Sequence, residues 1–188
     1  MSRDIAVIVG SLRAGSFNRK FAKVLVEVAP ASLRLSFVEI GALPLYNQDL
    51  DDGSKAVPPA WMAFRERMHA AQGVLFVTPE YNRSVPGVLK NAIDVGSRPY
   101  GQSVWQGKPA AVASVSIGAI AGFGANHHLR QSLVFLDMPT LQQPEAYIGG
   151  ADKLFDDNGQ LLNQGTRDFA ARFMQAYAAW VERIVQSH

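Results

Sequence analysis

The chain has 188 residues, of which 48% are hydrophobic and 18% charged, and this composition is typical of a globular domain with a sizeable core. A net charge of +2 without a dense Lys/Arg run argues against nucleic-acid binding, and the absence of Cys excludes disulfides, thiolate metal sites and a cysteine nucleophile. No apolar run approaches the roughly 20 residues that span a bilayer, and Asp4 lies where a signal peptide would be basic, so we expect one cytoplasmic domain over residues 1–188 without membrane contact.

The chain begins with a predicted strand, a Gly/Ser-rich loop and a predicted helix. The strand is the apolar run Ile5–Val9, and apolar residues at helical spacing indicate a helix over Asn18–Val28. Between them, residues 10–16 read Gly-Ser-Leu-Arg-Ala-Gly-Ser. Unpaired N–H groups and the positive end of the helix dipole make such a junction suitable for a phosphate. No Asp or Glu occurs from Ile5 to Val26, so the local charge also favours an anion.

The same residues also suit an ordinary strand-to-helix turn in which Ser16 or Asn18 is only the N-cap. The loop contains neither G-x-G-x-x-G nor G-x-x-x-x-G-K-[ST], so neither a dinucleotide fingerprint nor a Walker loop is supported. A phosphate bound here would belong to another kind of ligand.

Predicted strands and helices alternate through the rest of the chain, with no repeat or linker. The further predicted strands are Leu33–Glu39, Val74–Thr78, Ala110–Ser116 and a short one around Met138–Leu141. The further predicted helices are Ala60–Ala71, Pro86–Val95, Asn126–Phe135 and Asn163–Val185. The aromatic stripe of the last helix indicates core packing rather than a cofactor box. The acidic stretch Asp49–Asp52 after the second strand is interpreted as solvated surface or an interface rather than a metal site.

This alternation predicts an α/β fold: a flavodoxin-like three-layer sandwich with a five-stranded parallel sheet, order 2-1-3-4-5, and helices on both faces. In such sheets the ligand lies outside the carboxyl ends of the strands, next to strand 1. The loops after strands 1, 3 and 4 should therefore form the site. The loop after strand 3 is residues 78–87, which include two prolines, Tyr81 and Asn82. The loop after strand 4 is residues 114–124, which are rich in glycine.

A phosphate loop alone binds too weakly to retain a cofactor. One charge-assisted hydrogen bond contributes about 1.5–3 kcal/mol and a helix end about 0.3–1 kcal/mol, whereas micromolar affinity needs roughly 8 kcal/mol. A flat ring held between the second and third loops would supply the difference. FMN, with one phosphate and one tricyclic ring, fits this division.

Several motifs resemble the NADPH-dependent FMN reductase family, most closely its bacterial chromate and quinone reductases. They are Gly10–Arg13 with Gly15–Asn18, Thr78–Asn82, Ser84–Gly87 with Leu89–Asp94, and, for the same branch, His128–Gln131 and Val134–Asp137. Two positions differ from the family pattern: Val95 stands where Trp is frequent, which should loosen the packing behind that helix, and the third loop lacks an Arg after Gly122.

The resemblance implies non-covalent FMN, NADPH or NADH as co-substrate, and a homodimer or homotetramer. The residues it assigns to cofactor binding are Ser11, Leu12, Arg13, Gly15, Ser16, Phe17, Asn18, Pro79, Glu80, Tyr81, Asn82, Arg83, Ser116 and Gly118. Of these, Ser11, Arg13, Ser16 and Asn18 would hold the phosphate, and those of the second and third loops the ring, largely through backbone groups. Asn91 and Asp94 would anchor the helix behind the second loop, and His127 and His128 would be structural or interfacial. Arg83 is either a solvated surface residue or attracts an anionic acceptor.

The implied reaction passes a hydride from NAD(P)H through flavin N5 to quinones, chromate or similar acceptors, with azo dyes and free flavin as further candidates, by a ping-pong mechanism. No side chain acts as nucleophile and no metal is required. The alternative is a flavodoxin-type electron carrier that does not oxidise NAD(P)H, against which the pI of about 9.0 counts. A hydrolase would show a G-x-S-x-G elbow, which is absent, and a non-redox phosphate-binding module would leave Pro79–Asn82 unexplained.

Overall fold

A five-stranded parallel sheet forms the middle layer of the protein in a computed structural model that describes residues 2–186. Its strands are β1 (Arg3–Val9), β2 (Leu33–Val38), β3 (Gly73–Thr78), β4 (Ala110–Val115) and β5 (Ala146–Ile148). They lie in the order β2-β1-β3-β4-β5, all parallel, which confirms the predicted flavodoxin-like topology.

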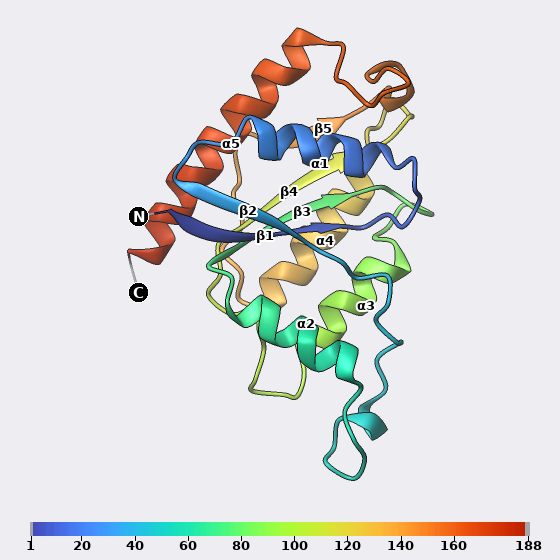
Figure 1. Cartoon of the computed structure of the whole chain (residues 1–188), viewed down its shortest axis with the longest axis vertical. Coiled ribbons are helices and arrows are strands. Elements are labelled where there is room, and N and C mark those ends of the chain that lie inside the picture. Colours follow the sequence, from blue (N-terminus) through green and yellow to red (C-terminus); the bar gives the residue numbers. More distant parts are fainter. Residues whose placement is uncertain (1, 187–188) are drawn as a thin grey trace.

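Helices cover both faces of the sheet (Figure 1). The helices are α1 (Phe17–Glu27), α2 (Pro59–His69), α3 (Gly87–Gly96), α4 (Phe123–Phe135) and α5 (Gln164–Val185), with 3-10 turns η1 (Gln48–Leu50) and η2 (Ala151–Lys153). α1 and α5 pack on one face and α2, α3 and α4 on the other. Within residues 2–186 no helix is long and apolar enough to cross a membrane.

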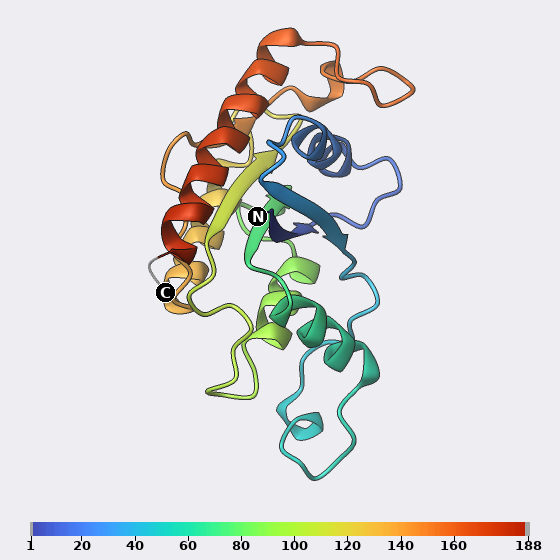
Figure 2. The same ribbon diagram turned by 60° about the vertical axis from the view of Figure 1, so that its left-hand side comes forward.

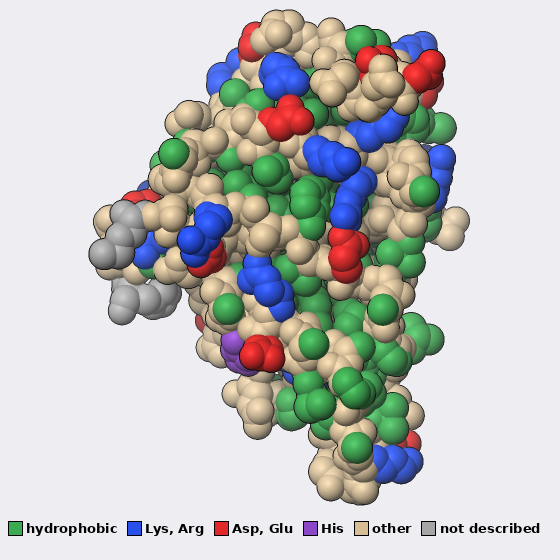
Figure 3. Space-filling view, viewed as in Figure 1, with side chains coloured by type: hydrophobic (Ala, Val, Ile, Leu, Met, Phe, Trp, Pro, Cys, Tyr) green, Lys and Arg blue, Asp and Glu red, His purple; other side chains and the backbone are tan. Residues whose placement is uncertain are grey.

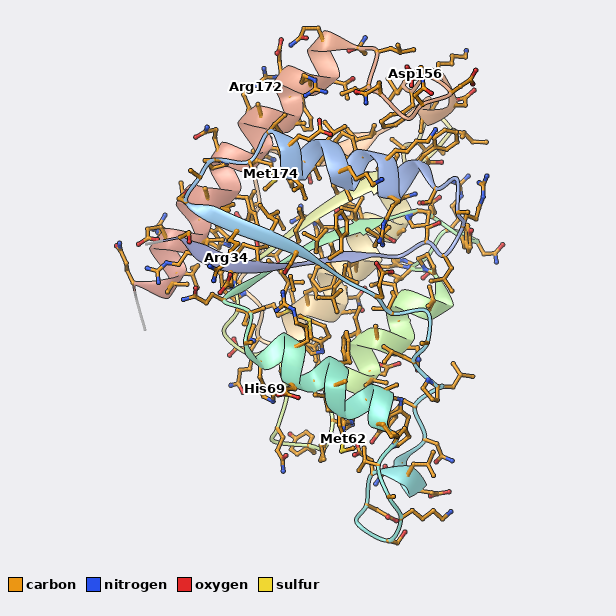
Figure 4. The ribbon with its side chains drawn as sticks, in the orientation of Figure 1. Arg34, Met62, His69, Asp156, Arg172 and Met174 are labelled. Carbon is orange, nitrogen blue, oxygen red and sulfur yellow. The ribbon has the colours of Figure 1, made fainter. Side chains whose placement is uncertain are left out.

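The two cores explain the unbroken apolar runs of the inner strands. In β1, Ile5, Val7 and Val9 join the core under α1 and α5, whereas Ala6 and Ile8 join the opposite core. The aromatic stripe of α5 is core packing, as predicted, since Phe173 and Tyr177 are buried. Figure 4 shows Arg172 on the outer side of α5 and Met174 on its inner side.

The predicted helices are correct in type and position, but the predicted strand Met138–Leu141 is wrong. In the sheet, that segment pairs only with the first residue of β4, where Ala110 N–H donates to Pro139 O and Leu141 N–H donates to Ala110 O. Pro139 and Pro144 have no N–H with which to continue the ladder. Pairing with β4 resumes only at Ala146–Ile148, which is the true fifth strand.

The segment between β2 and α2 extends away from the sheet (Figure 2), and its acidic stretch is only partly solvated surface. The Asp51 side chain is 1% exposed, and its two oxygens accept hydrogen bonds of 2.9 and 2.6 Å from Arg65. Arg65 Nε also donates to Val95 O at 2.9 Å. The prediction of a solvated patch is therefore wrong for Asp51, which ties this segment to α2 and α3.

The loosened packing expected around Val95 is not observed. Val95 is completely buried, and Trp105 from the following segment packs its indole beside α3. A Cβ at Gly96 would lie 2.6 Å from this indole, so the glycine is what allows the ring to approach the helix. Trp105 Nε1 donates to Ile93 O at 2.9 Å and fixes the ring there.

Candidate functional site

The carboxyl ends of β1, β3 and β4 lie in register and bring three loops together at one edge of the sheet (Figure 1). We call residues 10–16 the first loop, 79–86 the second loop and 116–122 the third loop. Gly10 N–H donates to Val77 O at 2.9 Å, which joins the first loop to β3. Asn18 Nδ2 donates to Val115 O at 3.3 Å, which joins the start of α1 to the end of β4. The three loops predicted to form the site therefore meet.

The first loop offers a series of unpaired backbone donors. Among residues 2–186, none of the N–H groups from Ser11 to Gly15 has a hydrogen-bond acceptor. Ser16 is the N-cap of α1, because its Oγ accepts from Arg19 N–H at 3.3 Å. Its own N–H donates to Arg13 O at 3.1 Å and closes the loop. These donors stand directly before a helix N-terminus with no acidic residue in its first turn, an arrangement that favours a phosphate.

Asn18 carries a second sign of an absent ligand. Its side chain is 5% exposed, and Oδ1 is a buried acceptor without a partner among the described residues. Leaving a buried polar atom unpaired costs about 1–3 kcal/mol. A ligand donor at this position would remove that cost.

Cations surround the first loop. Figure 3 shows Lys and Arg side chains gathered over α1. Arg19 pairs with Glu39 and lies over the Phe37 ring, so it has partners of its own. The Arg13 side chain is exposed and forms no hydrogen bond or ion pair within residues 2–186, so it is free to meet an anion.

The second loop is a tight hairpin. Tyr81 N–H donates to Ser84 O at 3.1 Å and Ser84 N–H to Tyr81 O at 2.9 Å. Asn82 and Arg83 between them have φ values of 50° and 63°, which defines a type I′ turn. A non-glycine residue in this region costs roughly 1–2 kcal/mol, so the surrounding contacts must hold the turn. Pro79 is buried, whereas Tyr81 is 53% exposed at the loop surface.

The carboxylate of Glu80 turns away from the loop surface toward α4. Oε1 accepts from Arg83 Nη1 at 2.9 Å and Oε2 accepts from Ala125 N–H at 3.0 Å. Only the backbone of Glu80 is therefore left for a ligand.

The third loop is exposed at residues 117–120, whereas Ala121 and Gly122 are buried. Ser116 N–H donates to Ile148 O at 2.9 Å, and Ser116 Oγ accepts from Gly118 N–H at 3.2 Å. A Cβ at Gly118 would meet nothing closer than 3.7 Å, so the space beside it is open. Apolar side chains protrude from this loop and from the start of α4: Ile117, Ile120 and Phe123 are 66%, 54% and 49% exposed.

The assigned residues differ in how they are placed. Ser16, Asn18 and Pro79 are buried; Ser11, Phe17, Glu80 and Ser116 are half-buried; Leu12, Arg13, Gly15, Tyr81, Asn82, Arg83 and Gly118 are exposed. The Phe17 ring stacks on Phe155 with centroids 6.3 Å apart, so it packs against the segment after β5. The contact of the second loop with Gly124 and Ala125 at the start of α4 was not predictable from the sequence, because a backbone donor leaves no signature in side-chain chemistry.

The neighbouring polar residues make structural contacts. Asn91 anchors α3 as predicted, because Oδ1 accepts from Tyr46 N–H at 2.8 Å and Nδ2 donates to Pro44 O at 3.0 Å. The prediction is wrong for the Asp94 side chain, which pairs with Lys90 of the same helix. His128 Nδ1 lies 3.0 Å from Ser84 Oγ, and His127 Nε2 lies 2.9 Å from the Tyr147 hydroxyl. Both histidines lie in the second turn of α4.

Tyr147 is held protonated. Partial burial and its hydrogen bond to Glu145 raise the pKa of Tyr147 to about 12. The hydroxyl donates to Glu145 at 2.8 Å, so Nε2 of His127 must be the donor toward Tyr147.

Comparison with known proteins identifies the family. The family model for NADPH-dependent FMN reductase matches residues 3–153. The chain is 65% identical, over 95% of each sequence, to a protein from Pseudomonas putida named quinone reductase. It is 49% identical, over 96% of this chain and 97% of the relative, to a 2-hydroxy-1,4-benzoquinone reductase from Burkholderia sp.

A solved structure gives the same result. The flavoenzyme FerB, an NAD(P)H:(acceptor) oxidoreductase from Paracoccus denitrificans, superposes with a TM-score of 0.88 at 39% identity. The alignment covers 96% of this chain and 98% of FerB. On this evidence the chain belongs to the NADPH-dependent FMN reductase family and is an oxidoreductase that uses FMN, with NAD(P)H as co-substrate.

Proposed function

We propose that this protein reduces quinones with electrons from NAD(P)H, and that FMN is held by the three loops at the carboxyl edge of the sheet. The observation that carries the proposal is the series of unpaired N–H groups from Ser11 to Gly15 at the start of α1. The names of the relatives from Pseudomonas and Burkholderia support quinones as acceptors.

The residues present fit a bound FMN. Its phosphate would accept hydrogen bonds from the first-loop amides and from Arg13, and a ribityl hydroxyl would donate to Oδ1 of Asn18. The Oγ of Ser16 accepts from Arg19 N–H, which leaves its hydroxyl hydrogen as a donor to the phosphate. The backbone of Pro79, Glu80, Tyr81, Asn82 and Arg83 on one side, and that of Ser116 and Gly118 on the other, would line the ring.

When bound, FMN would supply the redox chemistry, taking a hydride from NAD(P)H at its N5 atom and returning the electrons to an acceptor. The protein would position the reacting partners at the ring. The second and third loops would surround much of the ring and leave one face open. We therefore propose that NAD(P)H and the acceptor bind to this face in turn, in a ping-pong cycle.

The side chains at the rim of the site favour flat, apolar acceptors. Leu12, Tyr81 and Ile117 are each more than half exposed, and each belongs to a different loop of the site. Exposed apolar side chains gathered in this way are typical of a surface that binds an apolar ligand. Chromate is the second candidate, because Arg83, whose side chain is 70% exposed beside its ion pair with Glu80, would attract an oxyanion.

Stopped-flow spectroscopy tests the proposal. The purified protein should be yellow, anaerobic NADPH should bleach it within seconds, and a benzoquinone should restore the colour. Steady-state initial rates, measured with NADPH varied at several fixed quinone concentrations, should give parallel lines in a double-reciprocal plot. A yellow protein that NADPH does not bleach would instead be a carrier, and a protein that cannot bind FMN would refute the proposal.

We also propose that the protein works as a homo-oligomer in the cytoplasm, where NAD(P)H is available. A groove of about 570 Å³ lies between α3 and α4, and next to it Val134 and Phe135 are 76% and 78% exposed. Apolar side chains this exposed favour an interface with a second copy. Light scattering should give a dimer or tetramer, and Phe135→Glu should lower the mass toward that of the monomer; a wild-type monomer would refute this assembly.

A further inference from the structure

Glu80 connects two parts of the candidate site that lie far apart in the chain. Its carboxylate is 10% exposed and bridges the Arg83 guanidinium in the second loop and Ala125 N–H in the first turn of α4. The N-cap residue of α4, Gly122, has no side chain with which to cap the helix. The cap is instead supplied by Glu80, 45 residues earlier in the sequence.

The second loop and α4 are also in close steric contact. A Cβ at Gly124 would lie 2.9 Å from the Arg83 carbonyl oxygen and 2.9 Å from Glu80 Oε2. Only a glycine allows the hairpin to approach the helix this closely. A second polar contact, between His128 and Ser84, lies at the other end of the hairpin.

The charges at this contact complement each other. A carboxylate at a helix N-terminus interacts favourably with the helix dipole, and Arg83 supplies a cation on the other side. Arg83 of the second loop therefore pairs with Glu80 beside the start of α4. The left-handed conformation of Arg83 requires such support.

We propose that Glu80 is a positioning residue that locks the second loop onto α4 and thereby sets the gap in which the flavin ring is held. The inference rests on the proposed function, because it assumes that the ring lies between the second and third loops. The carboxylate does not touch the ring; it acts through the backbone of Pro79 and Tyr81, on either side of Glu80. Among residues 2–186, the first loop, which would hold the phosphate, forms no hydrogen bond with this carboxylate.

The test compares Glu80→Ala with Glu80→Gln. Both remove the charge, but the amide oxygen of Gln can still accept from Ala125 N–H. Glu80→Ala should weaken FMN binding at least tenfold and change the visible circular dichroism of the bound flavin at saturating FMN. Glu80→Gln should restore most of the affinity and the wild-type spectrum. Asp94→Asn is the matched control, because Asp94 is an exposed carboxylate that pairs with Lys90 on α3, and it should change neither.

Gly124→Ala tests the same contact without removing the carboxylate. The added methyl group would force the hairpin away from α4, so the bound flavin should show the same spectral change as in Glu80→Ala. If Glu80→Ala does not fold, Gly124→Ala still tests the contact between the second loop and α4.

Two results would overturn the proposal. The first is an FMN affinity of Glu80→Ala within twofold of the wild type together with an unchanged flavin spectrum. The second is a wild-type spectrum for FMN bound to Gly124→Ala. Failure of the proposed function gives a different result, since the wild-type protein would then not bind FMN or would not be bleached by NADPH.

Discussion

Replacement of Arg13 by Ala tests the proposed phosphate site at a side chain with no structural role. Arg13 is exposed and its guanidinium forms no hydrogen bond, ion pair or ring contact within residues 2–186, so its removal should leave the fold intact. Surface substitutions of this kind change stability by less than about 0.5 kcal/mol. The melting temperature should therefore move by no more than about 2 °C in a chain of this size.

The expected effect on binding follows from the lost contact. A hydrogen bond from a guanidinium to a phosphate contributes about 1.5–3 kcal/mol, so Arg13→Ala should raise the Kd for FMN by about 10- to 150-fold. Riboflavin has no phosphate, so its Kd should not change. Equilibrium dialysis or quenching of flavin fluorescence measures both constants.

Lys23→Ala is the matched control. It removes the same charge from an exposed position further along α1, where screening at physiological salt, with a Debye length of about 8 Å, weakens any long-range effect. Its Kd for FMN should stay within about twofold of the wild type. The reasoning would be refuted if Arg13→Ala behaved like Lys23→Ala, or if it weakened riboflavin as much as FMN.

Three further predictions concern stability. Asp51→Ala should lower the free energy of unfolding by about 3–5 kcal/mol, because it leaves the Arg65 guanidinium buried without its partner; a urea titration that shows less than 1 kcal/mol would contradict this. Asp137→Gly should raise the melting temperature by about 2–4 °C, since Asp137 follows α4 at φ 55° and a glycine there saves about 1 kcal/mol; an unchanged or lower value would count against the strain. Burial lowers the pKa of Lys108 to about 8, so folding disfavours its protonated form and the cost is fully present below pH 8. The stability of the wild type relative to Lys108→Met should therefore rise between about pH 8 and 10, and urea titrations with a pH-independent difference would contradict this.

The parts of the fold that were predictable are those where both faces of a strand are covered. β1, β3 and β4 lie between two helical layers, so their buried residues are almost all apolar, and the sequence shows this directly. β5 is a three-residue edge strand, and nothing in Ala146–Ile148 distinguishes it from the apolar segment Met138–Leu141 before it. A short edge strand is defined by its partner rather than by its own pattern.

The location of the site was predictable because the carboxyl ends of parallel strands must meet at one edge. How its loops are held together was not. Glu80 bonds to a backbone amide 45 residues away, and an amide donor looks the same in every residue. Asp51 was misassigned for a similar reason, because its burial depends on where Arg65 projects from α2. Contacts between residues that are far apart in the sequence can be identified only from the three-dimensional structure.

A crystal structure of the protein loaded with FMN tests the central claim most directly. We predict phosphate oxygens about 3 Å from the backbone N–H groups of Ser11 to Gly15, with the ring between the second and third loops. A phosphate bound away from the start of α1, or a ring outside the gap between Tyr81 and Gly118, would contradict the account.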